Sequence, residues 1–182
     1  MERLSRDQML MEHATVAAKR GTCSRLRVGA VFSREGRILA TGYNGAPKGQ
    51  PHCEHYVVGD GDRPEWVDDM MAQEWPEGCH FQPGEFFTRA GDDRRWERDV
   101  LHGCPIANHA ERNGIDFAAR HGISLEGSEV HVTHMPCPTC AGSLLNVGVK
   151  RVIYKVPYRI ASGVWMLTAA GIRVVDLSSM ER

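Results

Sequence analysis

The sequence has no apolar run long enough to span a lipid bilayer, and residues 1–13 lack the hydrophobic core of a signal peptide. It also has no internal repeat and no low-complexity tract, so a repeat architecture is not expected. The chain carries almost no net charge, −1 at pH 7. We therefore expect a cytoplasmic protein without a membrane partner.

The composition is that of an ordinary globular domain. The 182 residues are 42% hydrophobic and 25% charged, which suits a single domain over 1–182 with a sizeable core. The six cysteines indicate metal ligands more than disulfides, because cytosolic thiols stay reduced.

Charge is unevenly distributed along the chain. Residues 54–103 hold 13 acidic and 5 basic side chains, a net −8, whereas the remainder holds 10 acidic and 17 basic, a net +7. This stretch loses clear periodicity but contains three tryptophans, so we predict an acidic insertion with short helices, such as one over 63–75. The positive remainder suits a phosphorylated small substrate, and the acidic segment would repel nucleic acid. Alternatively, these charges only solvate the surface.

Two short motifs predict a catalytic zinc site. His109 and Glu111 frame a His-Ala-Glu motif, and Cys137 follows 26 residues after Glu111 in Pro-Cys-Pro-Thr-Cys, which ends at Cys140. Zinc binds nitrogen and sulfur tetrahedrally, and a catalytic site leaves the fourth position to water. The two cysteines lie three apart, on one face of a helix whose positive end favours thiolates. Glu111 can then move protons during hydrolysis.

Each half of this pattern has a plainer interpretation. Cys137 and Cys140 could belong to a closed structural zinc site or a redox pair. Glu111 could be a solvated carboxylate on a helix face. The combination of histidine, glutamate and paired cysteines favours the catalytic interpretation, and it resembles the signature of zinc deaminases that act on nucleobases.

Hydrophobic periodicity predicts alternating strands and helices around a sheet of roughly five strands, a three-layer α/β/α domain. The first helix should begin after an N-cap at Ser5 and stop at Gly21. Helices are expected over 5–21, 109–122, 137–149 and 160–171, and strands over 28–33, 37–43, 129–135, 151–156 and 172–177.

Four segments, 28–49, 109–122, 135–154 and 170–175, resemble the cytidine deaminase superfamily, and most closely the deoxycytidylate (dCMP) deaminases. The resemblance implies a single deaminase domain with a mixed sheet, apart from an insertion at about 54–103. It also implies hydrolytic deamination of dCMP to dUMP and ammonia, which supplies the dTMP precursor of pyrimidine metabolism. In that reaction a zinc-activated water attacks C4 of the cytosine, and Glu111 protonates N3 and then the leaving amine.

The resemblance implies further site residues. Asn44 matches a sugar-hydroxyl contact, although Asn-Gly is also a strong turn signal. Tyr158 matches an aromatic residue of the nucleotide pocket, although it could equally be core packing. The other residues placed near the nucleotide or its phosphate are Ala110, Ser24, Arg25 and Arg27.

Regulation and assembly are also implied by the resemblance. A loop of Gly42, Tyr43, Asn44 and Gly45 resembles the site through which dCTP activates and dTTP inhibits many family members, so Mg²⁺ could accompany a triphosphate effector. The family favours a homo-oligomer, with a hexamer expected. A second, structural zinc is implied by the resemblance of Cys23, Cys53, His102 and Cys104 to ligands in some relatives. The alternative for these cysteines is unpaired thiols.

Competing functions remain open at this point. A deaminase of tRNA or single-stranded DNA shares the zinc motifs but needs a basic track with stacking aromatics. A riboflavin-pathway deaminase is disfavoured, because its second and third zinc ligands lie further apart. A non-catalytic zinc scaffold would be expected to lose Glu111. The sequence does not separate dCMP from dCTP, deoxycytidine or a modified cytosine nucleotide.

Overall fold

The protein divides into two compact units. One comprises Met1–Gly21, Leu26–Gly45 and Asn108–Arg182, and the other comprises Thr22–Arg25 and Ala46–Ala107. The computed structural model describes residues 3–23, 26–49, 54–57, 86–89, 96–99, 107–158 and 160–179. No helix in this described part is long and apolar enough to cross a membrane.

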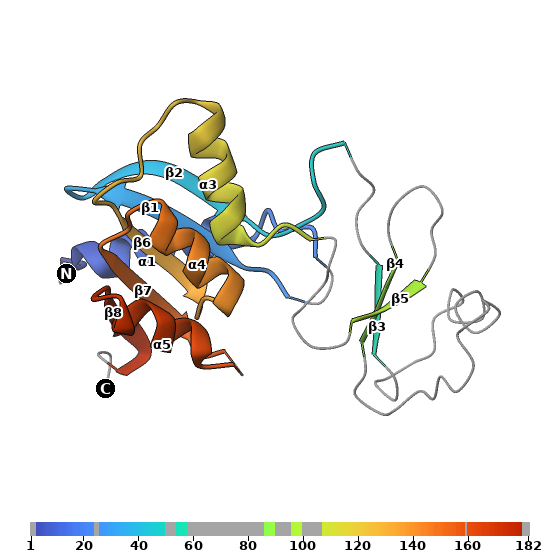
Figure 1. Ribbon diagram of the computed structural model, residues 1–182. Coiled ribbons are helices and arrows are strands. Elements are labelled where there is room, and N and C mark those ends of the chain that lie inside the picture. Colours follow the sequence, from blue (N-terminus) through green and yellow to red (C-terminus); the bar gives the residue numbers. More distant parts are fainter. Residues whose placement is uncertain are drawn as a thin grey trace. The chain divides into compact units, whose positions relative to one another are not determined.

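A five-stranded mixed sheet forms the centre of the first unit, with strand order β2-β1-β6-β7-β8 (Figure 1). β1 pairs antiparallel with β2 and with β6, whereas β6, β7 and β8 are parallel. The strands are β1 (Gly29–Arg34), β2 (Arg37–Tyr43), β6 (Glu129–His134), β7 (Arg151–Val156) and β8 (Arg173–Asp176). The predicted α/β class and mixed sheet of roughly five strands are confirmed.

The turn between β1 and β2 explains why this hairpin is tight. Glu35 and Gly36 both have positive φ, 53° and 77°. A two-residue turn with positive φ at both positions matches the right-handed twist of paired strands, and glycine adopts it without strain. Gly36 therefore suits its position in the turn, whereas Glu35 adopts a positive φ that is uncommon for residues other than glycine.

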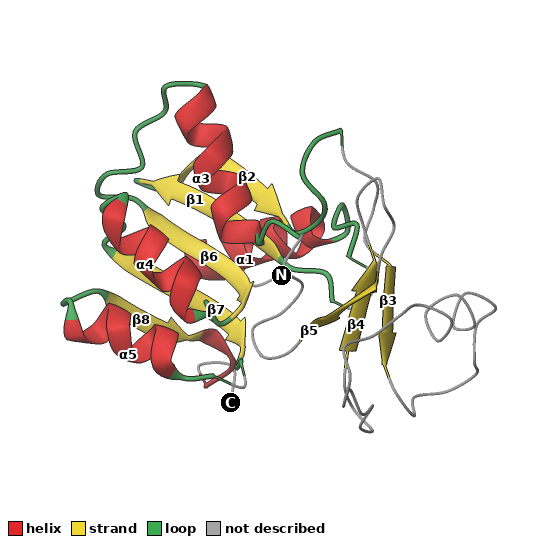
Figure 2. Cartoon of the chain, turned by 45° about the vertical axis from the view of Figure 1, so that its right-hand side comes forward, coloured by secondary structure: helices red, strands yellow, loops and turns green. Residues whose placement is uncertain are grey.

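Helices cover both faces of the sheet, so the domain has three layers (Figure 2). On one face, α1 (Arg6–Ala18) packs against alternate residues of the strands, and this core consists of Leu10, Met11, Ala14, Val31, Ile153 and Leu177. The other face carries α3 (Ala110–Arg120), α4 (Pro138–Asn146) and α5 (Ser162–Ala169). That core includes Phe32, Ala118, Val130, Val132, Leu144, Val152 and Leu167. Neighbouring residues on a strand thus serve opposite cores.

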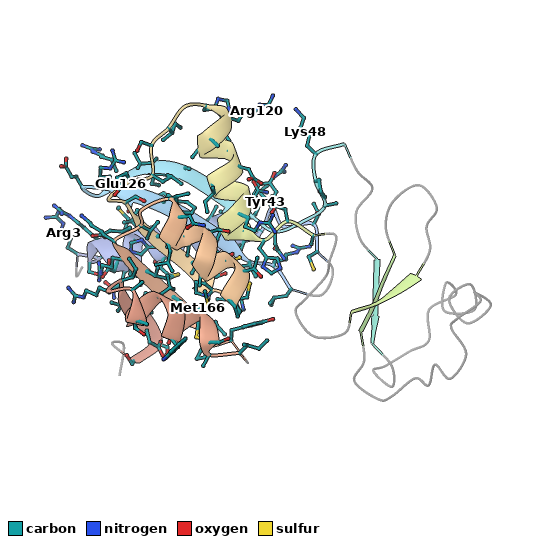
Figure 3. All side chains as sticks on the ribbon, in the orientation of Figure 1. Arg3, Tyr43, Lys48, Arg120, Glu126 and Met166 are labelled. Atoms are coloured by element: carbon teal, nitrogen blue, oxygen red, sulfur yellow. The ribbon has the colours of Figure 1, made fainter. Side chains whose placement is uncertain are left out.

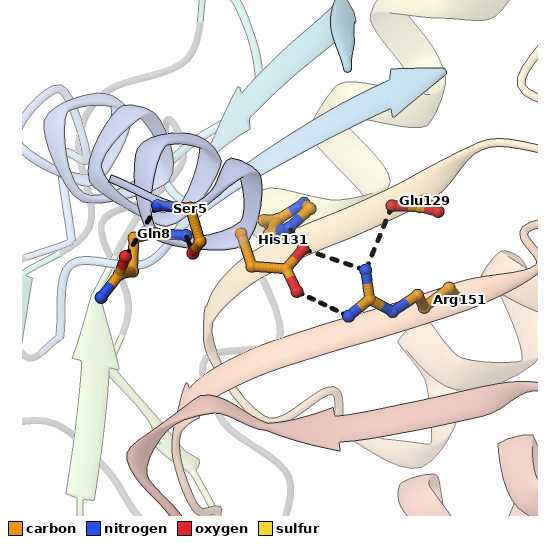
Figure 4. Close-up of polar contacts among 6 residues, drawn as sticks. Ser5, Gln8, Glu129, His131 and Arg151 are labelled. Atoms are coloured by element: carbon orange, nitrogen blue, oxygen red, sulfur yellow. Dashed lines mark hydrogen bonds and ion pairs between the residues drawn. The ribbon is translucent and has the colours of Figure 1, made fainter. Parts of the chain in front are cut away.

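The start of α1 is fixed by a cap and by charge. Ser5 and Gln8 form a capping box, with Ser5 N donating to Gln8 Oε1 at 2.8 Å and Gln8 N donating to Ser5 Oγ at 3.2 Å. This confirms Ser5 as the predicted N-cap. Asp7 accepts two hydrogen bonds from Arg151, at 2.9 and 2.6 Å, and lies 3.0 Å from Nε2 of the buried His131 (Figure 4). The pair Asp7–Arg151 therefore joins α1 to the sheet.

The second unit contains a three-stranded antiparallel sheet, formed by β3 (Glu54–Val57), β4 (Phe86–Arg89) and β5 (Trp96–Asp99). The sequence predicts short helices for this segment, but its described residues form strands. The helix expected over 63–75 lies outside the described residues. Short runs rich in aromatic and β-branched residues favour strands, but periodicity over four residues cannot distinguish them from helix.

Candidate active site

The three predicted zinc ligands meet where two helices begin. His109 is the N-cap of α3, and Cys137 is the N-cap of α4, whose first residue is Pro138. Proline suits this position because its missing N–H would be unsatisfied there. Cys140 follows within the first turn of α4. Both sulfurs therefore lie at the positive end of a helix dipole, which favours their negative form.

The donor atoms are arranged as a metal site requires. His109 Nδ1 lies 3.5 Å from Cys137 Sγ and 3.3 Å from Cys140 Sγ. The three donor atoms all lie within 4.8 Å of one another. Zinc bound tetrahedrally to nitrogen and sulfur would place these donors about 3.5 Å apart. Among the described residues, this is the one group of three or more His, Cys, Asp or Glu side chains that could hold a metal ion. Its nitrogen and two sulfur donors fit zinc.

The protonation of the two thiols shows what a cation would change. Their shared hydrogen bond lowers the pKa of Cys137 to about 4 and raises the pKa of Cys140, which burial raises further. Cys137 is therefore the thiol of this pair that loses its proton more readily. The hydrogen bond to Cys137 also raises the pKa of His109. A divalent cation would displace the remaining thiol proton, since zinc binds thiolate and neutral imidazole.

Glu111 lies one helical residue beyond Ala110 and is buried, with 4% of its surface exposed. Burial raises the pKa of its carboxyl group above the ordinary value of 4.5, and the charge of His109 partly opposes this. A raised pKa makes a carboxyl group easier to protonate, which a group that both takes up and releases protons requires. Glu111 is thus suited to proton transfer beside the three donors.

Glycines let the surrounding backbone approach the site closely. A Cβ on Gly163, at the start of α5, would overlap the carbonyl oxygen of Pro136 and come within 3.0 Å of the Cys137 carbonyl carbon. A Cβ on Gly42, in β2, would overlap the carbonyl oxygen of Ala110. Both helices of the site are therefore supported by direct backbone packing, which fixes their first turns.

The predicted nucleotide-binding residues have different environments. Asn44 is 8% exposed, and its side chain accepts from Val28 N at 2.7 Å and donates to Leu26 O at 2.6 Å. These bonds leave one amide hydrogen of Asn44 for another acceptor. Arg27 is exposed and Tyr158, just beyond β7, is half-buried. Ala110 is buried at the start of α3, and Ser24 and Arg25 lie outside the described residues.

Of the four residues predicted to bind a second zinc, the structure describes only Cys23. Cys23 is buried. Cys53, His102 and Cys104 lie outside the described residues, so the site stays a prediction.

Sequence reasoning missed two asparagines that hold the site together. Asn108 and Gly45 form a β-bridge, with backbone hydrogen bonds of 2.9 and 3.1 Å, and Asn113 Nδ2 donates to Tyr43 O at 2.8 Å. Figure 3 shows Tyr43 beside α3. Position 113 is four residues after His109, so helical spacing could have marked it as a neighbour of the metal ligand.

Comparisons with known proteins agree with this geometry. Residues 4–156 match the family described as the cytidine and deoxycytidylate deaminase zinc-binding region. The deoxycytidylate deaminase of Enterobacteria phage T2 is 32% identical over 176 residues, which cover 94% of this chain and 92% of that protein. The deoxycytidylate deaminase of Enterobacteria phage T4 is 33% identical over 173 residues, 92% of this chain and 88% of that one.

A solved structure extends the likeness to the fold. The crystal structure of dCMP deaminase from the cyanophage S-TIM5 in complex with dCMP and dUMP is 26% identical to this chain, with a TM-score of 0.62. The match covers 96% of this chain and 98% of that one. On the zinc-site geometry, the family match and these relatives, the chain belongs to the zinc-binding cytidine and deoxycytidylate deaminase family.

Proposed function

We propose that this protein is a zinc-dependent hydrolase that converts dCMP to dUMP and ammonia. The observation that carries the proposal is the convergence of His109, Cys137 and Cys140 beside the buried carboxyl group of Glu111. A structural zinc site needs no buried acid, whereas hydrolysis needs a group that transfers protons. The deoxycytidylate deaminases among the relatives, and the dCMP and dUMP bound by the cyanophage enzyme, indicate the nucleotide.

The side chains of the site divide the chemistry between them. His109, Cys137 and Cys140 would hold zinc, which when bound supplies a Lewis acid that makes water nucleophilic near neutral pH. Glu111 accepts a proton from the attacking water and delivers it to N3 of the pyrimidine. It then transfers the second proton to the departing amine, so that water and dCMP become dUMP and ammonia. Burial of Glu111 supports both transfers, since it keeps the protonated form accessible.

The nucleotide would be held by groups from the chain next to β1 and β2, from the start of α3 and from the residues after β7. Asn44 would bind the sugar hydroxyl with its remaining amide hydrogen, and Tyr158 would line the base pocket. Ala110 would contact the base through its backbone at the start of α3. The phosphate is assigned to the cationic stretch of Ser24, Arg25 and Arg27, because charge-assisted hydrogen bonds recognise phosphate strongly.

Regulation and assembly form the wider part of the proposal. The residues Gly42 to Gly45 would bind dCTP or dTTP with Mg²⁺, and the protein would assemble as a homo-hexamer. A structural zinc bound by Cys23, Cys53, His102 and Cys104 would stabilise the insertion. The positive charge of the chain outside 54–103 supports a small anionic substrate over nucleic acid.

Ammonia release across a substrate panel tests the proposed function. The panel contains dCMP, dCTP, deoxycytidine, single-stranded DNA and tRNA, each incubated with zinc-loaded protein. We expect dCMP to be used with the highest kcat/KM, and deoxycytidine to be much poorer because it lacks the phosphate. Equal activity on dCMP and deoxycytidine would refute the nucleotide assignment, and release from nucleic acid alone would favour a polynucleotide deaminase.

A further inference from the structure

The peptide bond between Tyr43 and Asn44 is held at both of its polar ends. Its carbonyl oxygen accepts a hydrogen bond from Asn113 Nδ2 on α3, at 2.8 Å. Its N–H donates to the carbonyl oxygen of Val28, at 3.1 Å. The orientation of this peptide plane is therefore set by α3 on one side and by the chain before β1 on the other.

On either side of this peptide, β2 and the residues after it contact α3 and the chain before it through backbone atoms. Gly42 packs directly against the first turn of α3, where a Cβ would overlap Ala110 O. Gly45 forms its bridge with Asn108, one residue before His109. Between these two contacts, Asn113 provides a side-chain hydrogen bond from α3 to the backbone of residue 43. The alignment of α3 with the end of β2 therefore depends in part on this side chain.

We infer that Asn113 is a positioning residue that aligns the nucleotide-binding Asn44 with the catalytic start of α3. Asn113 shares its helix with Glu111 and lies four residues after His109. A backbone group that Asn113 binds is therefore held in place relative to the carboxyl group of Glu111. It holds the Tyr43 carbonyl, and the next residue is Asn44. The inference rests on the proposed function, because only that function makes Asn44 a contact of the substrate.

The effect on catalysis follows from the constraints on Asn44 itself. Its side chain is already bonded to Leu26 O and Val28 N, so its free amide hydrogen points in one direction. Rotation of the Tyr43–Asn44 peptide would turn that hydrogen away or break one of the existing bonds. Loss of a contact that holds the substrate equally in the ground state and the transition state raises KM and leaves kcat unchanged. Asn113 prevents this rotation.

Steady-state kinetics of Asn113→Ala and Asn113→Asp test the inference. Asp has nearly the shape of Asn, but its carboxylate cannot donate to the Tyr43 carbonyl. The matched control is Ser143→Ala on α4, which also removes one side-chain hydrogen bond to the backbone, at 3.2 Å to Thr139 O. We expect both Asn113 variants to raise KM for dCMP about tenfold, with kcat within about threefold of wild type. Zinc content and Tm should match those of Ser143→Ala.

A double-mutant cycle with Asn44→Ala asks whether Asn113 acts through Asn44. If it does, adding Asn113→Ala to Asn44→Ala should change KM less than about twofold, since the contact is already lost. Independent, multiplicative effects would overturn the inference. If Asn44→Ala does not fold, the KM and kcat of the single variants decide.

Three further results would contradict the positioning role. These are unchanged kinetics in Asn113→Ala, a fall in kcat with KM unchanged, and a joint loss of zinc, Tm and activity, which indicates a general structural role. Wild-type protein that leaves dCMP unchanged would overturn the proposed function and this inference together. An active wild type with a fully active Asn113→Ala overturns the inference alone.

Discussion

His131 is the buried side chain whose protonation most directly concerns the stability of this protein. Its ring is fully buried, with Nε2 3.0 Å from Asp7 Oδ1 and Nδ1 without a hydrogen-bond partner among the described residues. Burial lowers the pKa of His131 below its ordinary value of 6.5, although Asp7 opposes the shift. A protonated imidazole would need a second acceptor. Both observations favour the neutral form of His131 in the folded protein.

Acid should destabilise the fold through this histidine. Because the pKa of His131 in the folded protein is below 6.5, the unfolded chain binds more protons at this residue than the folded protein does. The contribution of neutral His131 to the free energy of unfolding is therefore fully present above about pH 6.5 and is lost as the pH falls below that value. The slope for one proton is at most about 1.4 kcal/mol per pH unit. We expect Tm to fall more between pH 7.5 and 5.5 in wild type than in His131→Gln, which keeps a donor towards Asp7. Zinc release in acid lowers the Tm of both proteins, so it cancels in the difference between their Tm values. If Tm falls equally with pH in both proteins, His131 does not cause the acid destabilisation.

The zinc donors and Glu111 could be predicted because their spacing encodes their geometry. Cys137 and Cys140 share a helix turn, and Glu111 follows His109 by two residues, so neither relation depends on the rest of the fold. The bond from Asn113 to Tyr43 joins positions 70 residues apart. It could not be predicted, because it depends on how closely β2 approaches α3.

Among the elements, the contact of β1 with α1 depends on one glycine. A Cβ on Gly29 would overlap the carbonyl oxygen of Ala14 and come within 2.5 Å of Ala18 N. These are backbone atoms of a helix, so they cannot move aside as a flexible side chain would. Gly29 thus sets the distance between the helix and the sheet.

Gly29→Ala should destabilise the protein by about 1–3 kcal/mol or more, as overpacking does. Gly142→Ala on α4 is the matched control, because a Cβ there meets nothing within 4 Å. In a helix interior that change should stabilise by about 0.5–1 kcal/mol. Urea unfolding measures both variants. A Gly29→Ala protein as stable as wild type would show that the helix can shift.

The elements of the first unit could be predicted because each carries its own signal. The capping box at Ser5 and Gln8 marks a helix start, and strand alternation in Val130 and Val132 marks a buried face. The strands of the second unit could not, because β3, β4 and β5 have four residues each and lie far apart in sequence. Their formation depends on pairing, which local patterns do not encode.

For the whole molecule, the number of bound zinc ions distinguishes the two proposed metal sites. We expect one zinc that is lost in Cys137→Ser, with activity abolished and the fold retained. A second zinc should be lost in Cys53→Ser, with a lower Tm because structural zinc stabilises the folded state directly. Metal analysis and thermal unfolding of the purified variants check both. One zinc in wild type, together with full stability of Cys53→Ser, would refute the second site.

Allosteric control requires effectors that bind one state of an oligomer better than another. If the loop from Gly42 to Gly45 binds triphosphates, dCTP should make the dCMP saturation curve less sigmoidal and dTTP should make it more sigmoidal. Initial rates over a range of dCMP concentrations, with and without each triphosphate and Mg²⁺, measure this. Hyperbolic curves unaffected by either triphosphate would mean that the loop only forms a turn.

The central claim is that Glu111 transfers protons during deamination of dCMP at the site formed by His109, Cys137 and Cys140. It is tested most directly by measuring dUMP and ammonia formed from dCMP by wild type and Glu111→Gln at equal zinc content. Glu12→Gln, which changes an exposed glutamate on α1, is the control. The account predicts equimolar products from wild type and the control, and a loss of at least about 10²- to 10⁴-fold in Glu111→Gln. Turnover by Glu111→Gln close to that of wild type would contradict it.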